Sequence, residues 1–462
     1  MPGLENYNGH YCESQYEYAF IGFLENEGWQ YLCGNNVSRI TKRDVVIEED
    51  FKTFISKTNP DLTDNEVTQI YDSVRLVGAE SEFATLHKVY GWMVDGIQFT
   101  PENGVTKMVP LIDFDIPENN VFKVVNQLVV EYTNHGQKST RRPDVLLYVN
   151  GMPLCVIELK NPADANATVY NAWEQINMRY WRDIPHLLRY CPLACISDGV
   201  KTRLGTVRTP YEHFYAWRRV NDGDKVSTLP FAETETMIKG VYSPKRFLEI
   251  FRDYIYFQDT IYNSDEVEIV CRYPQFFASR LLKQSIIDSV VSKSGKGGTY
   301  FGATGCGKTY TMAFLARQLA LRCTDIPEIG SPTIILIVDR DELQKQGAKL
   351  FTKSTEFLNL GEVSIVKDRA QLRQELGLRQ SGGFYICTIQ KFCDRKEDKI
   401  GLINDRQNII CFSDEAHRTQ IEHSKKIQFS KDADKNDEAT LFSTVGNLPE
   451  PQYAKNSLII FN

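Results

Sequence analysis

The chain has 462 residues, of which 42% are hydrophobic and 24% are charged, and its formal net charge at pH 7 is −7. A chain of this length and composition can build two or three hydrophobic cores, so it predicts a soluble multidomain protein. Because the overall negative field would repel a DNA duplex, any DNA contact must depend on local basic patches. Candidate patches occur at 141–142, 201–208 and 218–219, although runs of this kind are more often ordinary solvated surfaces.

Eleven cysteines are scattered along the chain, and several lie in apolar segments, such as Cys155, Cys195, Cys387 and Cys411. No C-x-x-C pair occurs. This usage predicts small core residues in a reducing cytoplasm, and neither a disulfide framework nor a zinc site. With no secretory signal and no apolar run of about eighteen residues, we expect a cytoplasmic protein that is neither exported nor inserted into a membrane.

The first predicted element is an amphipathic helix that begins near Glu13. Phe20, Phe23 and Leu24 recur at helical spacing on its apolar side. Glu13 and Glu17 lie in its first turns, where carboxylates favour a helix N-terminus.

Two strands joined by a tight turn are predicted further along, at 142–149 and 152–159. The turn between them is Asn150-Gly151, a strong hairpin signal. The second strand ends in Glu158-Leu159-Lys160, and because side chains alternate along a strand, Glu158 and Lys160 project to the same face.

Asp144, Glu158 and Lys160 of this hairpin suggest a metal-dependent nuclease. The two carboxylates could share a Mg²⁺ that activates water and neutralises a scissile phosphate, while Lys160 orients the nucleophile or stabilises developing charge. For an E-x-K triplet alone, the ordinary interpretation is a solvated charged edge after a core strand.

The register of the hairpin decides whether Asp144 and Glu158 can meet. A strict two-residue turn pairs Val149 with Met152 and leaves the two carboxylates on opposite faces. A three-residue loop that ends in a left-handed Gly151 shifts the pairing by one residue and puts both carboxylates on one face. The functional hypothesis therefore predicts a glycine bulge at Gly151.

A helix is predicted next, at 168–181, and it carries Gln175 and Tyr180. Taken alone, these two residues are equally well explained as an exposed and a half-buried helix position. Together with 143–144 and 158–160, however, they resemble the core of the PD-(D/E)xK nucleases, in the subgroup with an extra glutamine and tyrosine after the catalytic strand.

This resemblance implies an endonuclease domain over residues 1–260. Asp144 and Glu158 would hold the metal, and Asp144, Glu158 and Lys160 would be catalytic. Gln175 and Tyr180 would contact DNA or support the site. Glu13 or Glu17 could add an oxygen to the metal shell, as the first helix does in many of these nucleases, or simply favour the helix start.

A phosphate-binding loop is predicted at 302–309, where the sequence GATGCGKT fits the pattern G-x-x-x-x-G-K-[ST]. An apolar strand at 299–303 precedes it and a helix at 309–321 follows it. The glycines let successive N–H groups point at the phosphates, and the positive end of the helix adds to the attraction. Lys308 would reach the β and γ phosphates, and the Thr309 hydroxyl would hold Mg²⁺.

Strands and helices alternate after this loop, which predicts a parallel α/β sheet with the nucleotide at the carboxyl ends of the strands. The predicted strands are 299–303, 333–338, 363–366, 384–389 and 409–412. Asp414 and Glu415 follow the last of them. Asp414 would complete the Mg²⁺ shell, and Glu415 would position or deprotonate the attacking water.

The run Asp-Glu-Ala-His at 414–417, after a phosphate loop, resembles the helicase and translocase superfamily 2. Residues 272–275 are similar to the segment in which a glutamine, here Gln275, recognises adenine, and 335–341 and 388–390 resemble strand-end motifs that touch the DNA backbone. The resemblance implies a first RecA-like lobe over 261–462. The residues expected to contact the nucleotide or its Mg²⁺ are Gln275, Gly302, Thr304, Gly305, Gly307, Lys308, Thr309 and Asp414.

A nuclease of this kind followed by a superfamily 2 motor resembles the restriction and translocation subunit of type I restriction–modification enzymes. The phrases at 156–162, 338–340 and 414–420 look characteristic of that family. The resemblance implies a subunit that uses ATP and Mg²⁺ to pump double-stranded DNA and cut it far from the recognition site. Its partners would be separate methyltransferase and specificity subunits.

The sequence departs from the pattern of this family in one respect, and it leaves two other functions open. A superfamily 2 motor needs a second lobe, and few residues follow Asp414, so we expect a fragment without that lobe. The chain could instead be an ATP-dependent DNA-repair helicase whose nuclease-like domain only binds DNA, but intact Asp144, Glu158 and Lys160 argue against it. It could also be an assembly module with a structural nucleotide, against which Glu415 argues.

Overall fold

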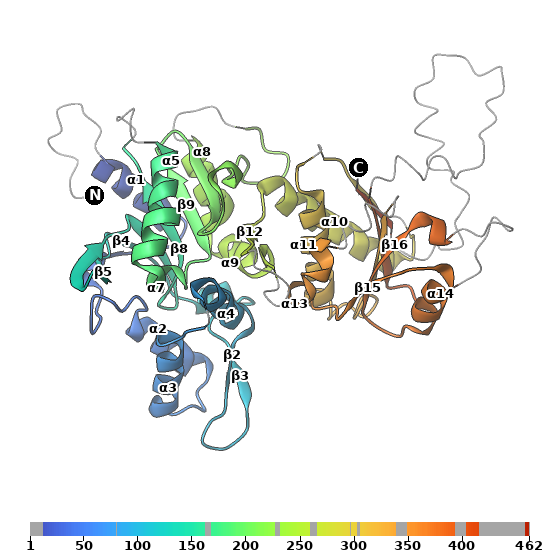
Figure 1. Cartoon of the computed structure of the whole chain (residues 1–462), viewed down its shortest axis with the longest axis horizontal. Coiled ribbons are helices and arrows are strands. Elements are labelled where there is room, and N and C mark those ends of the chain that lie inside the picture. The colour runs from blue at the N-terminus through green and yellow to red at the C-terminus, as the bar shows by residue number, and fades with distance from the viewer. Residues whose placement is uncertain are drawn as a thin grey trace, which may run out of the picture. The chain divides into compact units, whose positions relative to one another are not determined.

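The computed structural model describes residues 13–79, 81–161, 168–226, 232–258, 266–295, 297–302, 305–338, 349–392, 403–414 and 458–461. The chain divides into two compact units, Met1–Tyr273 and Pro274–Asn462 (Figure 1). The division falls beyond the boundary expected at 260/261, because strands β11 (Ile255–Phe257) and β12 (Glu268–Val270) pair across that point. No helix in the described segments is long and apolar enough to cross a membrane.

The first unit is built on a six-stranded mixed sheet in the order β1-β4-β7-β8-β9-β10. These strands are β1 (Gln30–Cys33), β4 (Phe122–Asn126), β7 (Val145–Val149), β8 (Met152–Leu159), β9 (Leu193–Ser197) and β10 (Thr202–Thr206). Every residue of β7 and β8 is buried, so both faces of the sheet centre are covered. Asp144, which precedes β7, and Glu158 and Lys160, at and after the end of β8, therefore lie at the middle of the sheet.

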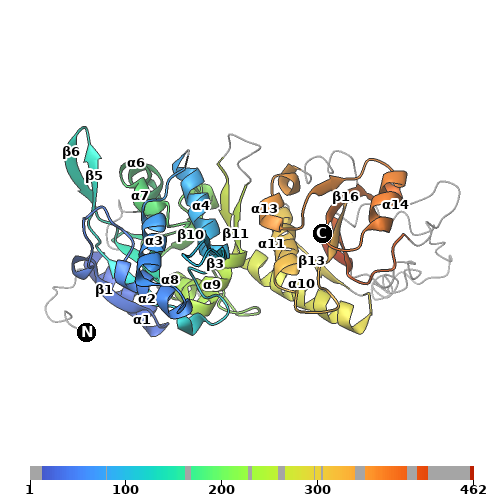
Figure 2. The ribbon, with the colours of Figure 1, turned by 90° about the horizontal axis from the view of Figure 1, so that it is seen from below.

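Helices and two further hairpins complete the first unit. The helical segments are α1 (Glu13–Asn26), α2 (Glu48–Thr58), α3 (Asp64–Arg75), α4 (Glu82–Asp95), α5 (Val169–Glu174), the π-helical segment η3 (Gln175–Tyr180), α6 (Trp181–Asp183), α7 (Pro185–Leu188), α8 (Ala232–Met237), the π-helical segment η5 (Ile238–Tyr242) and α9 (Pro244–Asp253). One hairpin joins β2 (Ile97–Phe99) to β3 (Lys107–Val109), and the other joins β5 (Val130–Asn134) to β6 (Gln137–Arg141). Figure 2 shows the β5–β6 hairpin projecting from its unit.

The second unit is a parallel sheet in the order β13-β18-β17-β14-β16-β15. All pairings within it are parallel, as the alternating pattern predicted. Its elements are α10 (Tyr273–Ser292), β13 (Gly298–Tyr300), α11 (Lys308–Leu321), β14 (Thr333–Val338), α13 (Thr355–Leu358), β15 (Val363–Ile365), α14 (Arg369–Leu378), β16 (Phe384–Thr388), β17 (Ile409–Asp414) and β18 (Leu458–Phe461). Each predicted strand lies within a few residues of an observed one, and β18 inserts between β13 and β17.

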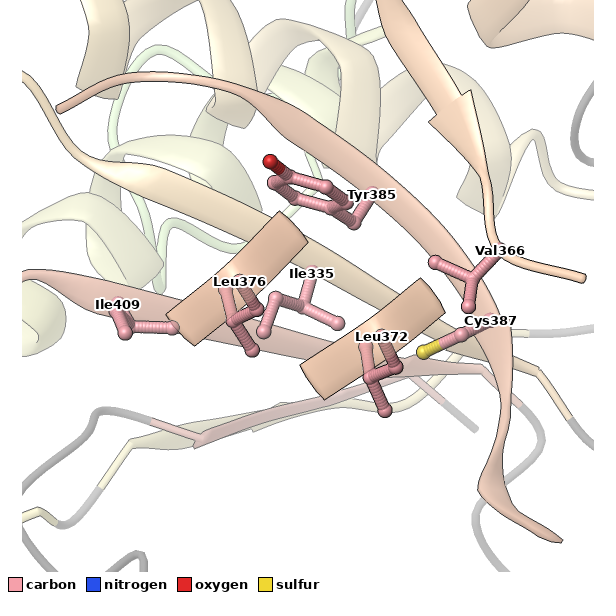
Figure 3. Packing of buried hydrophobic residues seen from close by; sticks show 7 residues of the cluster. All are labelled: Ile335, Val366, Leu372, Leu376, Tyr385, Cys387 and Ile409. Atoms are coloured by element: carbon pink, nitrogen blue, oxygen red, sulfur yellow. The ribbon is translucent and has the colours of Figure 1, made fainter. Parts of the chain in front are cut away.

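Helix α14 covers one face of this parallel sheet through a compact apolar cluster (Figure 3). Leu372 and Leu376 are four residues apart, so they lie on one side of the helix. They pack with side chains from the strands and from the turn after β15, and the cluster comprises Ile335, Val366, Leu372, Leu376, Tyr385, Cys387 and Ile409. The packing holds β14, β16 and β17 in place, and the carboxyl ends of these strands carry the predicted nucleotide and DNA motifs.

Candidate active sites

The β7–β8 hairpin brings Asp144 and Glu158 together, but not by the predicted glycine bulge. The turn is the two-residue type, with Val149 opposite Met152, and both turn residues are left-handed (Asn150 φ 48°, Gly151 φ 78°). The bulge lies further along the hairpin, because Tyr148 pairs with Pro153 while Leu147 pairs with Cys155. The prediction of a bulge at Gly151 was therefore wrong.

The extra residue of this bulge is Leu154, which follows a proline. Pro153 has no N–H to donate, and prolines within sheets are confined to edges and bulges. Beyond the bulge Val145 pairs with Ile157, so the register carried one residue further sets Asp144 opposite Glu158. Residues directly opposite in an antiparallel pair share a face.

The contacts of the two carboxyl groups agree with this register. The backbone N–H of Leu159 donates to Asp144 Oδ2 at 2.8 Å. Glu158 is fully buried, and its pKa is raised well above the ordinary value by burial first and then by the Asp144 carboxyl, with Lys160 opposing the rise. The two carboxyl groups are thus electrostatic neighbours.

Lys160, Gln175 and Tyr180 all converge on Glu158. Lys160 Nζ lies 3.2 Å from Glu158 Oε1 and donates to Gln175 Oε1 at 3.1 Å. Gln175 Nε2 donates to Glu158 Oε1 and, at 2.7 Å, to the Tyr180 hydroxyl. The Tyr180 hydroxyl in turn donates to Glu158 Oε2 at 3.1 Å. Both oxygens of the buried carboxylate therefore have partners.

The helix that carries Gln175 and Tyr180 is not the regular α-helix that the sequence predicted at 168–181. It begins as α5, becomes the π-helical segment η3 between these two residues, and ends as α6. A π-turn aligns residues five apart, whereas in an α-helix they diverge. The irregular turn thus lets both side chains reach the same carboxylate.

The sequence analysis missed two side-chain amides beside these carboxylates. Asn126 is the last residue of β4, and Gln127 follows it. Asn126 Nδ2 donates to Glu17 Oε1 at 2.6 Å. Gln127 Nε2 donates to Glu17 Oε2 at 2.5 Å and to Asp144 Oδ1 at 3.3 Å. Glu17 therefore lies beside the carboxylate pair with both of its oxygens accepting amide hydrogen bonds, while the side chain of Glu13 lies outside the described residues.

The chemistry of these donors suits a magnesium ion. Mg²⁺ prefers oxygen ligands and usually binds through one or two carboxylates, retained water and a substrate phosphate. Asp144 and Glu158 supply such a pair. Within the described segments no group of three or more His, Cys, Asp or Glu residues is arranged to hold an ion. In this part of the chain a bound Mg²⁺ would therefore need water or substrate oxygens as further ligands.

The phosphate-loop motif in the second unit has the backbone that its sequence predicts. Gly305 (φ 79°) and Gly307 (φ 85°) are left-handed, which favours glycine, and Gly307 precedes the first turn of α11. Lys308 Nζ donates to the carbonyl of Gly302 at 3.1 Å, so its ammonium lies over the loop. Thr309 is partly exposed at the same helix end. Thr304 lies outside the described residues.

Gln275 is held against this loop. It is 4% exposed, and its Nε2 donates to the carbonyl of Gly307 at 3.0 Å. A Cβ on Gly307 would come within 2.5 Å of this nitrogen, so a larger residue there would displace the Gln275 amide. The segment at the start of α10 that was expected to recognise adenine is therefore adjacent to the loop expected to bind phosphates.

The carboxyl ends of three parallel strands meet at one edge of the sheet. Thr388 ends β16 opposite Val338 of β14, and Asp414 ends β17 one residue beyond the β14 pairing of Ser413 with Ile337. Asp414 also pairs with Phe461 of β18. Glu415 and the predicted motif residues at 339–341 lie outside the described residues. Asp414 and Thr388 occupy the edge where nucleotides bind in open α/β sheets.

Comparisons with known proteins point to one group of enzymes. Residues 11–213 match the family model for the type I restriction enzyme R protein N terminus, and residues 274–436 match the SWI2/SNF2 ATPase model. The type I restriction enzyme HindI endonuclease subunit of Haemophilus influenzae is 30% identical over 440 residues, covering 91% of this chain and 40% of that protein.

Two further relatives give the same result. The putative type I restriction enzyme MjaIXP endonuclease subunit of Methanocaldococcus jannaschii is 28% identical over 432 residues, covering 87% of this chain and 39% of that protein. The type I restriction enzyme SauMSSORF170P endonuclease subunit of Staphylococcus aureus is 24% identical over 435 residues, covering 90% and 42%. The chain spans about two fifths of the length of the curated relatives it matches.

Proposed function

Since the chain belongs to the family of type I restriction enzyme endonuclease subunits, we propose that its first unit cleaves DNA with Mg²⁺ and its second unit binds and hydrolyses ATP. In this proposal the first unit has a PD-(D/E)xK nuclease core. The second is the first RecA-like lobe of a superfamily 2 motor. One observation carries the nuclease assignment: Lys160, Gln175 and Tyr180 converge on the buried Glu158, and the Asp144 carboxyl from a third segment lies beside it, held by the Leu159 N–H.

The chain's own groups have distinct roles in the proposed cleavage. Asp144 and Glu158 would hold the Mg²⁺, which supplies charge neutralisation for the scissile phosphate and lowers the pKa of bound water. Lys160 is close enough to Glu158 to orient a water molecule beside it, and its ammonium would stabilise charge that develops on the phosphate. Gln175 donates to one oxygen of Glu158 and Tyr180 donates to the other, so the two side chains hold the carboxylate in one orientation.

In the second unit the roles follow from the edge of the parallel sheet. Gly302, Thr304, Gly305 and Gly307 would wrap the phosphates with backbone N–H groups, and Lys308 would contact the β and γ phosphates. Thr309 and Asp414 would bind the Mg²⁺ of the nucleotide, and Gln275 would contact the base. Glu415 would orient the attacking water.

The activity of the whole protein extends this proposal. We infer that a protein of the relatives' full length uses ATP to pump double-stranded DNA in the cytoplasm and cuts it as part of a complex. Methyltransferase and specificity subunits would select the DNA. The support is the joint match to a restriction enzyme R-protein model and an ATPase model on one chain.

The test is a pair of variants in the assembled complex. Asp144→Asn should abolish cleavage of a plasmid that carries an unmodified recognition site while ATP hydrolysis persists, because the two sites belong to separate units. Lys308→Ala should abolish ATP hydrolysis and, with it, cleavage that depends on translocation. Asp95→Asn, an exposed aspartate at the end of α4, is the matched control and should leave both activities unchanged. Equal loss of both activities in a folded Asp144→Asn protein would overturn the assignment.

A further inference from the structure

Gln127 directly follows strand β4, and its side chain lies between two buried carboxylates. Its side-chain nitrogen donates to Glu17 Oε2 at 2.5 Å and to Asp144 Oδ1 at 3.3 Å. Glu17 is 5% exposed and Asp144 is 8% exposed. A primary amide suits this place, because it is neutral and its nitrogen carries two hydrogens, one for each carboxylate.

The backbone of Gln127 also holds Asp144. Its N–H donates to the Asp144 carbonyl at 3.0 Å and so continues the β4–β7 ladder by one residue. The turn that follows is pressed against Gly34, where a Cβ would come within 2.3 Å of the Asn126 carbonyl oxygen. Gln127 is thus fixed from both sides at the point where its side chain enters the site.

Gln127 adopts a left-handed backbone conformation (φ 51°). Glycine adopts that conformation without strain and asparagine tolerates it, whereas a long side chain is disfavoured there. Glycine would therefore be the favoured residue here if the position only formed the turn. The presence of a glutamine, with its amide on both carboxylates, indicates that the side chain has a role beyond the turn.

The contacts of Asp144 show what that role is. Its Oδ2 accepts from the Leu159 N–H and its Oδ1 accepts from Gln127. With a donor on each oxygen, the plane of the carboxylate is set relative to Glu158. Both Glu17 oxygens accept amides, from Asn126 and from Gln127, so Glu17 acts here as the anchor of Gln127.

We propose that Gln127, anchored by Glu17, is a positioning residue that holds the Asp144 carboxylate in the orientation that binds a divalent cation. This inference rests on the proposed nuclease function of the first unit. Partners that orient metal ligands typically contribute about 10- to 100-fold to metal affinity. The effect of removing the Gln127 amide is therefore expected on cation affinity.

The experiment measures Mn²⁺ binding to the 462-residue chain at pH 7.5, without nucleotide, from the free-ion signal in electron paramagnetic resonance. The component lost in Asp144→Asn defines the nuclease site. Gln127→Gly removes the amide and favours the turn, so affinity at this component should fall about 10- to 100-fold although the fold is kept. Gln127→Met, which keeps the length of the side chain without its donors, should show the same loss.

A matched control separates the amide from the turn. His135 is also left-handed (φ 47°) and lies at the exposed tip of the β5–β6 hairpin, so His135→Gly makes the same backbone change away from the site and should leave Mn²⁺ affinity unchanged. Wild-type affinity in Gln127→Gly would overturn the positioning role and leave the nuclease proposal standing. If Asp144→Asn removes no Mn²⁺ binding at all, the metal site of the proposed function itself fails.

Discussion

Replacing Tyr180 by phenylalanine removes one hydroxyl from the candidate nuclease site and nothing else. That hydroxyl accepts from Gln175 at 2.7 Å and donates to Glu158 at 3.1 Å, on a side chain that is 1% exposed. A net loss of about 1.5–3 kcal/mol is typical for a hydrogen bond to a charged group. The substitution should therefore lower stability and loosen the Glu158 carboxylate.

Two measurements follow from that magnitude. The melting temperature of the first unit should fall, at roughly 2–4 °C per kcal/mol for a domain of 150–250 residues. If the same free energy holds Glu158 in its cleaving orientation, DNA cleavage by the assembled complex should slow roughly 10- to 150-fold, since about 1.4 kcal/mol is tenfold in rate. ATP hydrolysis, on the other unit, should not change.

Tyr190→Phe is the matched control for this change. The Tyr190 hydroxyl is equally buried and donates to the Val74 carbonyl at 2.8 Å, away from the carboxylates. Tyr190→Phe should lower stability by the about 0.5–1.5 kcal/mol that is typical of a neutral hydrogen bond and leave cleavage at the wild-type rate. If Tyr180→Phe and Tyr190→Phe cleave DNA equally well, Tyr180 only packs the fold and the proposed support of Glu158 is refuted.

Three further predictions concern separate parts of the molecule. Glu415→Gln should keep ATP binding, measured by equilibrium dialysis, and lose hydrolysis, because the loop and Asp414 remain; loss of binding would show that Glu415 has a structural role. Burial, reinforced by the charges of nearby arginines, lowers the pKa of His186 from 6.5 to about 4, so the unfolded state gains the proton first and stability is lost as pH falls below about 6.5. Between pH 7 and 5 this amounts to about 2 kcal/mol, which His186→Gln should remove in denaturant titrations at the two pH values. Saturating ATP should slow maleimide labelling of Cys306 in the phosphate loop and leave labelling of Cys33 in the first unit unchanged, and equal protection of both thiols would contradict a nucleotide site at this loop.

The parallel sheet of the second unit could be predicted from the sequence because each part of the signal is local. A short apolar run such as 333–338 is long enough for a buried strand, and a left-handed glycine such as Gly307 is required by the phosphate-loop pattern itself. Strand order and the insertion of β18 beside β17 depend on contacts between distant segments, which no local pattern encodes.

Gln127 shows why part of the nuclease site could not be predicted. No motif includes it, and its partners Glu17 and Asp144 lie 110 and 17 residues from it in the sequence. A weak signal was present, since Asn126 and Gln127 are two polar residues directly after the apolar run of β4. Polar side chains at the end of a buried strand can reach a site only if the neighbouring strand has the right register, and here the β4–β7 pairing of Asn126 with Val145 continues to set Gln127 opposite Asp144.

Two irregularities, a β-bulge and a π-turn, assemble the site. Each redirects a side chain that a regular strand or helix would point away from Glu158. In an uninterrupted β7–β8 ladder the two-residue turn would set Asp144 opposite Ile157 and face it away from Glu158; the extra Leu154 restores a common face. In a regular α-helix Gln175 and Tyr180 would point about 140° apart, and the π-turn between them brings both to Glu158. A bulge or a π-turn disturbs the regular backbone hydrogen bonding of its strand or helix. Such insertions therefore persist where a function requires the side chains that they redirect. Here both insertions redirect side chains to the same buried carboxylate.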